Sequence, residues 1–221
     1  MILDNTKYLV FLFIFFIVNL SYAEESKILE KYNSEIKEIK SILINKHNIN
    51  SNYIDTVFQE IKFRKKTLDS MSNAVERKAT WERYKKIFIT QKRIKEGVAY
   101  HKKNYKILQE IEKKYGVPSE VIVAFLGVET NYGKGTGRVK VLDSIATLAL
   151  QHPRRSKYFK AQLIYFIVLT YQNKLDFNSL YGSYAGAMGA PQFMPESYIK
   201  LGVDYNKDGK VDLWNDKYDI Y

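Results

Sequence analysis

The chain has 221 residues, of which 46% are hydrophobic, and it carries a formal charge of +11 at pH 7. This hydrophobic content is enough for the core of one domain beyond the N-terminus. The sequence has no cysteine, which excludes a disulfide scaffold, a thiolate zinc site, a cysteine nucleophile and an acylated cysteine anchor.

The positive charge does not by itself indicate a nucleic-acid partner. Lysine, isoleucine, asparagine and tyrosine are abundant throughout the chain, as nucleotide bias in a source genome can produce. Basic residues are concentrated in residues 62–114 without a pattern of stacking aromatics or an RNA-binding motif. Solvated helix faces explain them better. We therefore expect no nucleic-acid partner, although a cationic surface would favour an anionic cell-wall polymer.

Residues 1–23 have the features of an export signal. Lys7 precedes an apolar run over residues 8–20, and residues 21–23 (SYA) place small side chains where a signal peptidase reads them. The run is shorter than the roughly 20 residues that a membrane-spanning helix needs. We predict export, cleavage after Ala23 and a periplasmic location without stable membrane insertion. An uncleaved membrane anchor is the alternative.

The next segment, residues 24–52, is predicted to be a helical lead-in followed by an Asn-rich loop. Apolar residues recur at helical spacing at Ile28, Tyr32, Ile36, Ile39 and Leu43. The loop is expected over residues 45–52, where asparagine is frequent. This segment would precede a single domain over residues 53–221.

Further helices are expected over residues 53–114, because apolar and charged residues alternate there with helical periodicity. Gly116 should end one helix and Pro118 should be the first residue of the next. Two more helices are predicted over residues 141–150 and 158–171. No useful run alternates with the period of a strand, so we expect an all-α, mostly helical fold with at most one small hairpin.

The helix that begins at Pro118 ends in a single carboxylate, Glu129. Residues 121–128 (VIVAFLGV) place apolar side chains on every face, which predicts a buried helix. Apolar burial raises the pKa of a carboxyl group and can make it a proton donor near neutral pH. Gly127 and Gly133 would leave room for a bulky group to approach. Alternatively, Glu129 only satisfies neighbouring backbone amides or an arginine.

Five sequence blocks occur in register along the chain. They are residues 115–118 (YGVP), 127–133 (GVETNYG), 142–148 (LDSIATL), 153–159 (PRRSKYF) and 182–195 (GSYAGAMGAPQFMP). Together they resemble the lytic murein transglycosylase B family, whose lysozyme-like catalytic core acts on peptidoglycan. The resemblance is weak from residue 53 and strong from Trp81 to the last residue. It implies a lysozyme-like fold and peptidoglycan glycan strands as the partner.

The resemblance assigns catalysis to Glu129 without a cofactor. Glu129 would protonate the glycosidic oxygen between N-acetylmuramic acid and N-acetylglucosamine, then deprotonate the muramyl 6-hydroxyl to give a 1,6-anhydro end. Glycosidases usually need two carboxylates, but Asp143 and Glu196 both fit the first turn of a helix, Asp143 as a cap. The alternatives are a lysozyme-type hydrolase and an inactive remnant that binds glycan or nothing.

Several residues are expected to contact the substrate. Ser183 and Gln192 match family positions that line the cleft, and hydroxyl and amide groups can hydrogen-bond acetamido sugars. The glycines of residues 182–189 would let the backbone approach a sugar ring. The pair at 190–191, Ala-Pro, departs from the aromatic-glycine pair that is common in the family.

Four further residues are candidates with open alternatives. Tyr132 and Tyr184 could stack on sugar faces or belong to the core. Arg154 and Arg155 could bind the lactate or peptide carboxylates of the substrate, or form structural ion pairs.

Residues 204–212 (DYNKDGKVD) resemble the start of an EF-hand loop. Asp204, Asn206 and Asp208 occupy positions 1, 3 and 5, glycine occupies position 6, and the Lys210 carbonyl falls at position 7. Asn215 stands where the closing glutamate is expected, and in this family a later acid, here Asp219, would close the loop. We predict a weak structural Ca²⁺ site, with a simple turn as the alternative.

Family members continue beyond the position of Tyr221 into helices that complete the cleft. The domain over residues 53–221 is therefore expected to be incomplete at its C-terminal end, with one wall of the cleft missing.

Overall fold

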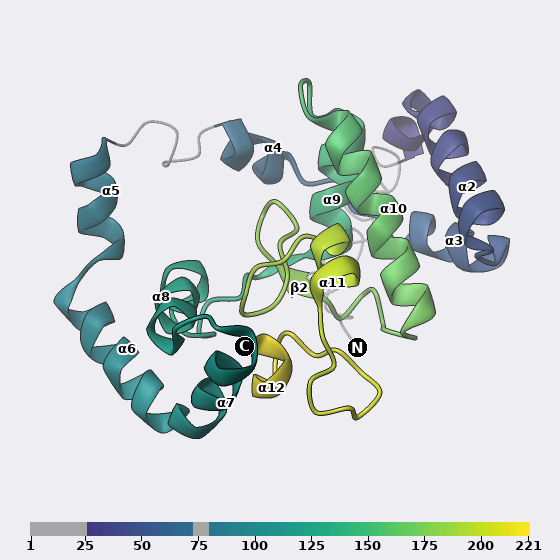
Figure 1. The fold of residues 1–221 in the computed structure, drawn as a ribbon. Helices are drawn as coiled ribbons and strands as arrows, with labels where there is room; N and C mark the ends of the chain where they lie inside the picture. Colours follow the sequence, from purple (N-terminus) through teal and green to yellow (C-terminus); the bar gives the residue numbers. More distant parts are fainter. Residues whose placement is uncertain (1–25, 73–79) are drawn as a thin grey trace, which may run out of the picture.

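The computed structural model describes residues 26–72 and 80–221, so the predicted export signal lies outside the described residues. The ribbon is mostly helical (Figure 1), which confirms the predicted all-α class. Within these two ranges, no helix combines the length and the apolar character needed to cross a membrane.

Helices follow one another along the described chain, interrupted by two short strands (Figure 1). The helices are α2 (Asn33–His47), α3 (Ser51–Gln59), α4 (Lys65–Ser72), α5 (Trp81–Phe88), α6 (Gln91–Lys103), α7 (Tyr105–Tyr115), α8 (Ser119–Thr130), α9 (Val141–Gln151), α10 (Ser156–Gln172), α11 (Pro195–Leu201) and α12 (Lys217–Ile220). The strands are β1 (Val139–Lys140) and β2 (Tyr181–Gly182).

The two short strands form an antiparallel pair in which Val139 faces Gly182 and Lys140 faces Tyr181. They do not form the small hairpin that the sequence allowed, because α9 and α10 lie between them in the chain. The pairing instead returns the chain after α10 to the start of α9. It therefore places residues 182–193 next to the residues that follow α8.

The main hydrophobic core is built around the antiparallel pair α9 and α10. Every residue of α9 from Val141 to Leu150 is buried, and α10 contributes the fully buried rings of Phe159 and Phe166. Helices α2, α3 and α4 cover this pair and add side chains to the same core: Ile36, Ile39, Leu43, Ile54, Val57, Phe58 and Met71. The helix predicted as a lead-in is thus part of the main core.

The Asn-rich loop is shorter than predicted. Helix α2 continues to His47, and Asn48 adopts the left-handed conformation (φ 52°) that ends it. The side chain of Asn50 then caps α3 by accepting hydrogen bonds from the backbone N–H groups of Asn52 and Tyr53. The asparagines therefore end one helix and begin the next, so the connection spans residues 48–50 instead of 45–52.

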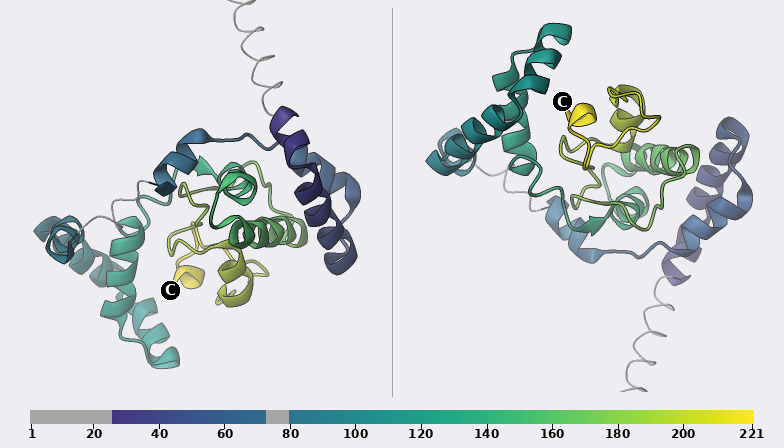
Figure 2. Two further views of the ribbon diagram at one scale, coloured as in Figure 1. Left: turned by 90° about the horizontal axis from the view of Figure 1, so that it is seen from above. Right: turned by 90° about the horizontal axis from the view of Figure 1, so that it is seen from below.

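Helices α5 to α8 form a second group beside the main core (Figures 1 and 2). Gly116 ends α7 in a left-handed conformation as predicted. Pro118 was expected to be the first residue of α8, but it is the N-cap, and the helix begins at Ser119. Short helix α12 docks on this group through two hydrogen bonds. Lys217 donates to the side chain of buried Asn104 at 2.8 Å, and the Tyr221 hydroxyl donates to the Tyr100 hydroxyl at 2.9 Å.

Asp143 is not the helix cap that the sequence suggested, because the N-cap of α9 is Lys140. Its fully buried carboxylate accepts hydrogen bonds from the Lys62 backbone N–H at 3.0 Å and from Arg64 Nε at 2.8 Å. A buried carboxylate needs such partners to offset its desolvation. Asp143 therefore fastens the segment between α3 and α4 onto α9.

We expect Asp143→Ala to lower the free energy of unfolding by about 3 kcal/mol, because it leaves the Lys62 N–H without its acceptor and removes the Arg64 ion pair. Chemical denaturation measures this loss. Asp55→Ala is the matched control, since the Asp55 carboxylate pairs with Lys40 while 53% exposed and should contribute less than about 1 kcal/mol. Equal losses in the two variants would contradict the anchoring role.

Candidate active site

Helix α8 is buried on one side only. Val123, Leu126, Gly127 and Thr130 are buried, and α6 and α7 pack against this side. On the opposite side Val121, Phe125 and Val128 are 55%, 48% and 39% exposed. The prediction of a helix buried on every face was therefore wrong. These three apolar side chains remain partly exposed although the helix is apolar all round, so the apolar composition of α8 did not reveal which side is buried.

Glu129 lies on the exposed side of α8, next to this stripe. Its carboxyl makes no hydrogen bond or ion pair within the part of the chain that the structure describes. Desolvation by the surrounding protein raises the pKa of the Glu129 carboxyl above its ordinary value. The predicted direction of the pKa shift is thus confirmed, although the residue is much less buried than expected. Water reaches the carboxyl, yet its surroundings still disfavour the charged form.

Two loops meet at the C-terminal end of α8. The Thr130 hydroxyl, one residue after Glu129, donates to the Ala190 carbonyl at 2.9 Å. Gln192 Nε2 donates to the carbonyls of Thr136 at 3.1 Å and Gly189 at 2.9 Å. These bonds join residues 131–138 and 189–193 directly behind Glu129. The structure therefore brings the predicted Gln192 to the same end of α8 as the predicted acid.

Ser183 belongs to the same group of loops but has a local partner. Its half-buried side-chain oxygen accepts hydrogen bonds from the backbone N–H groups of Ala185 at 3.3 Å and Ala187 at 3.0 Å. The backbone at Gly137 packs so closely on Gly182 that an added Cβ would lie 1.8 Å from the Gly182 carbonyl oxygen. Ser183 thus shapes the turn that faces residues 131–138.

The glycines predicted to approach a sugar are used for packing within the protein. An added Cβ at Gly182 would lie 2.2 Å from the Ala187 carbonyl, and one at Gly186 would lie 2.3 Å from Ile145. At Gly189 the nearest atom would be the Leu213 carbonyl oxygen, 2.5 Å away. The space beside these glycines is filled, so packing within the protein explains why they are glycines, and the approach of their backbone to a sugar stays a prediction.

The two candidate tyrosines, Tyr132 and Tyr184, pack against different parts of the protein. The Tyr132 hydroxyl donates to the Arg93 carbonyl of α6 at 2.7 Å, and its ring packs 5.4 Å from the ring of Tyr100. Tyr132 is half-buried and packs against α6, which fits the alternative to sugar stacking. Its stacking on a sugar stays a prediction. Tyr184 is half-buried and packs against the main core.

Arg154 and Arg155 lie apart from Glu129, in the turn between α9 and α10 at the top of Figure 1. This turn follows the 11 residues of α9, which span about 16 Å from the loops around Ser183. The Arg155 guanidinium lies 4.7 Å from the centre of the Tyr158 ring. Neither arginine has a structural ion pair in the described residues, and their role toward substrate carboxylates stays a prediction.

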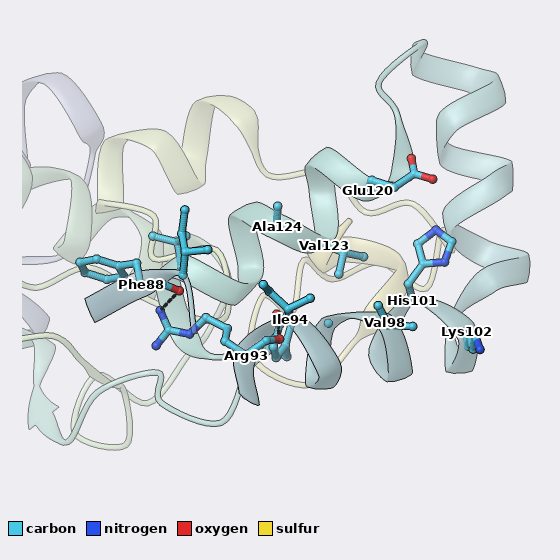
Figure 3. A pocket seen from close by; sticks show the side chains of 13 residues that line it. Phe88, Arg93, Ile94, Val98, His101, Lys102, Glu120, Val123 and Ala124 are labelled. Carbon is cyan, nitrogen blue, oxygen red and sulfur yellow. Dashed lines mark hydrogen bonds between the residues drawn. The ribbon is translucent and has the colours of Figure 1, made fainter. Parts of the chain in front are cut away.

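An apolar cavity of about 500 Å³ lies between α5, α6 and α8, and sequence analysis did not identify it (Figure 3). Ile94 and Val98 of α6 face Val123 and Ala124 of α8, whereas His101 and Glu120 lie at one end of the cavity. Val128, the residue before Glu129, also lines it. The cavity therefore runs along the flank of α8 that faces α5 and α6, and Glu129 is not among the residues that line it.

An exposed row of aromatic rings continues from this cavity along α5. Trp81 is 67% exposed and stacks on Tyr84 with the ring centres 6.3 Å apart, and Tyr84 contacts Phe88 at 4.4 Å. Phe88 lines the cavity. These three aromatic residues are spaced i, i+3 and i+7, which places them on one face of a helix, and this spacing is the feature of the sequence that could have revealed the row.

The EF-hand-like loop is folded around backbone amides. The side-chain oxygens of Asp204 and Asn206 both accept from the backbone N–H of Asp208, at 3.1 and 3.0 Å, so these oxygens converge. Asp219 accepts from the N–H groups of Tyr205 and Asp212 and joins the two ends of the loop. No group of three His, Asp or Glu side chains suited to a metal occurs in residues 26–72 and 80–221. The loop offers carboxylate, amide and carbonyl oxygens, which are donors that Ca²⁺ accepts.

This architecture matches a known family over most of the chain. The family described as "Transglycosylase SLT domain" matches residues 31–221. The chain belongs to the SLT transglycosylase family. The match starts before α2, so it includes the helix that was treated as a lead-in.

Relatives in this family support the assignment. The chain is 35% identical over 196 residues to the membrane-bound lytic murein transglycosylase B of Escherichia coli K12. The matched residues cover 83% of this chain and 53% of that protein. The E. coli lytic transglycosylase Slt35, solved in complex with calcium, has a TM-score of 0.74 and 35% identity over 81% of this chain and 57% of its own. SltB3 of Pseudomonas aeruginosa, solved with NAG-anhNAM-pentapeptide, has a TM-score of 0.75 and 26% identity over 86% and 50%. This SLT chain spans about half the length of the curated relative that it matches.

We expect Glu129→Gln to leave the melting temperature unchanged or slightly higher at about pH 7. Because the folded-state pKa is raised, folding favours the protonated carboxyl, and stability is lost as pH rises through that pKa. Glutamine stays neutral at every pH. Thermal unfolding at about pH 7 and about pH 4 measures the difference, which should disappear at the lower pH where both side chains are neutral. A large loss of stability at neutral pH would mean that the carboxylate has a stabilising partner.

Proposed function

We propose that this SLT chain is a lytic transglycosylase that cleaves the β-1,4 bond between N-acetylmuramic acid and N-acetylglucosamine in peptidoglycan. The observation that carries the proposal is the state of Glu129. Its pKa is raised by desolvation alone, and no neighbouring carboxylate contributes to the shift. A single acid without a partner suits an intramolecular reaction that does not need to activate water.

The reaction requires Glu129 to act twice. Protonated Glu129 donates its proton to the glycosidic oxygen, so the bond from this oxygen to C1 of the muramyl ring breaks and the N-acetylglucosamine product leaves with a hydroxyl. The resulting carboxylate then accepts the proton of the muramyl 6-hydroxyl. The oxygen of this hydroxyl bonds to C1 at the same time. Glu129 is protonated again, and the 1,6-anhydro ring forms because the internal hydroxyl is held close to C1.

Substrate binding is proposed for Gln192 at the end of α8, for Trp81 on α5, and for Arg154 and Arg155 in the turn after α9. Gln192 retains its carboxamide oxygen for an acetamido N–H, since its nitrogen is bonded to backbone carbonyls. The exposed ring of Trp81 offers a flat apolar face for a sugar. Arg154 and Arg155 could reach only the peptide or lactate portion of a long strand, because their turn lies beyond α9.

The cellular assignment follows from the sequence. Export, cleavage after Ala23 and a periplasmic location would give the enzyme access to murein, which a chain in the cytoplasm does not contact. The positive charge of +11 complements the carboxylates of peptidoglycan stems.

We also propose that residues 204–212 bind a calcium ion that stabilises the fold and takes no part in catalysis. Asp204, Asn206, Asp208 and the Lys210 carbonyl would supply oxygens, and Asp219 would hold the ends of the loop together. The calcium complex of Slt35 supports this proposal by analogy.

We expect Glu129→Gln to lower muralytic activity at least about 100-fold, since the amide cannot donate the required proton. Mass spectrometry of digested murein measures both the rate and the products. The parent should release 1,6-anhydromuramyl ends, whereas Glu196→Gln, a control at a carboxylate bonded to Gln162 and Lys200, should keep most activity.

The product distinguishes the proposal from its alternatives. Reducing ends would indicate a lysozyme-type hydrolase, because water would then have attacked C1. The absence of any product from the folded parent would indicate a protein that only binds glycan, or an inactive one. Activity in Glu129→Gln close to that of the parent would remove Glu129 from the mechanism.

Calcium at 10 mM should raise the melting temperature, and Asp208→Ala should abolish the rise. For a dissociation constant on the order of 10⁻⁴ to 10⁻³ M, binding would stabilise the fold by about 1.4 to 2.7 kcal/mol. Thermal unfolding with sodium chloride at equal ionic strength is the control for screening. An unchanged melting temperature in calcium would identify the loop as a simple turn.

A further inference from the structure

The end of α8 that carries Glu129 is held by the residue three positions later, Tyr132. Asn131 and Tyr132 both adopt left-handed conformations, with φ of 51° and 62°, which are uncommon for residues other than glycine. These two residues reverse the chain directly after the helix. As a result the Tyr132 ring returns to the flank of α8 and lies between α8 and α6.

Two glycines make the space for this ring. An added Cβ at Gly97 of α6 would lie 2.5 Å from the Tyr132 hydroxyl oxygen, and one at Gly127 of α8 would lie 2.8 Å from the same ring. Glycine in the middle of a helix costs stability relative to alanine. Both helices carry this cost at the two places where the ring touches them.

The ring is also held at its polar end and from behind. Its hydroxyl donates to the Arg93 carbonyl in the first turn of α6 at 2.7 Å. Tyr100 packs against it with ring centres 5.4 Å apart, and Tyr100 in turn accepts a hydrogen bond from Tyr221. The hydroxyl and the ring of Tyr132 are thus engaged by the protein itself.

We infer that Tyr132 is a positioning residue for Glu129: by locking the end of α8 onto α6, it holds the carboxyl in place for proton transfer. The inference rests on the proposed function of Glu129. Because the outer side of α8 is uncovered, the contacts on its inner side decide where its last turn lies. Thr130 fixes this turn to residue 190, and Tyr132 fixes it to α6.

Tyr132→Phe tests the inference with one atom removed. The variant loses the bond to the Arg93 carbonyl but keeps the ring, so we expect kcat to fall about tenfold while KM stays within about twofold. Tyr105→Phe, the same change at a tyrosine of α7 that is 56% exposed, should match the parent. A residue with only a structural role would lower the melting temperature without lowering kcat at a temperature where the variant is folded.

A double-mutant cycle tests the packing of the Tyr132 ring against Gly97 independently of activity. Gly97→Ala should lower the melting temperature of the parent, because the new methyl group meets the Tyr132 hydroxyl. In Tyr132→Phe the nearest remaining ring atom lies 3.2 Å from the added Cβ, so the same change should lower the melting temperature less than it does in the parent. Gly135→Ala is the control, since its added Cβ meets only the Thr130 carbonyl at 3.6 Å.

The outcomes separate the two proposals. An active parent with unchanged kcat in Tyr132→Phe would overturn the positioning role. A rise in KM alone would instead assign Tyr132 to sugar binding. Failure of the parent to form anhydro products would overturn the proposed function itself, and this result is obtained before any variant is compared.

Discussion

The hydrogen bond from the Thr130 hydroxyl to the Ala190 carbonyl joins the two halves of the site. One half is α8, which carries Glu129 and packs against α6 and α7. The other half consists of the loops that extend from the main core. The same hydroxyl accepts the backbone N–H of Gly133 at 2.9 Å, so one buried side chain fixes both the helix end and the turn after it. Because buried polar groups are costly when unpaired, this arrangement strongly disfavours sliding of α8 relative to residues 189–193.

Much of the fold could be predicted from local patterns. The apolar periodicity of α9 and α10 and the glycine that ends α7 are determined by residues close in the chain, and their bounds agree with the structure to within two residues. The motif around Glu129 also led to the family. In each case the information lies within a single element, where period, propensity and capping act together.

The remaining features depend on partners distant in sequence. Asp143 resembled a cap because its buried contact with Arg64 lies 79 residues away. The outer face of α8 resembled a core surface because composition indicates how apolar a helix is but does not indicate what covers it. The glycines after β2 were assigned to sugar binding, whereas Ile145 and Leu213 fill the space beside two of them. Residue type identified these positions as special without identifying the neighbour responsible.

The connection between the first helices and α9–α10 has a consequence for the order of folding. Tyr53 donates to Thr170 across 117 residues of sequence, and Lys62 reaches Asp143 across 81. Contacts of such long range carry a loop-closure cost and slow the folding of a domain. Helices α2 to α4 leave the ribosome first but find their apolar partners only after α10 has been synthesised. During synthesis these first helices therefore remain without a core until the last third of the chain has followed.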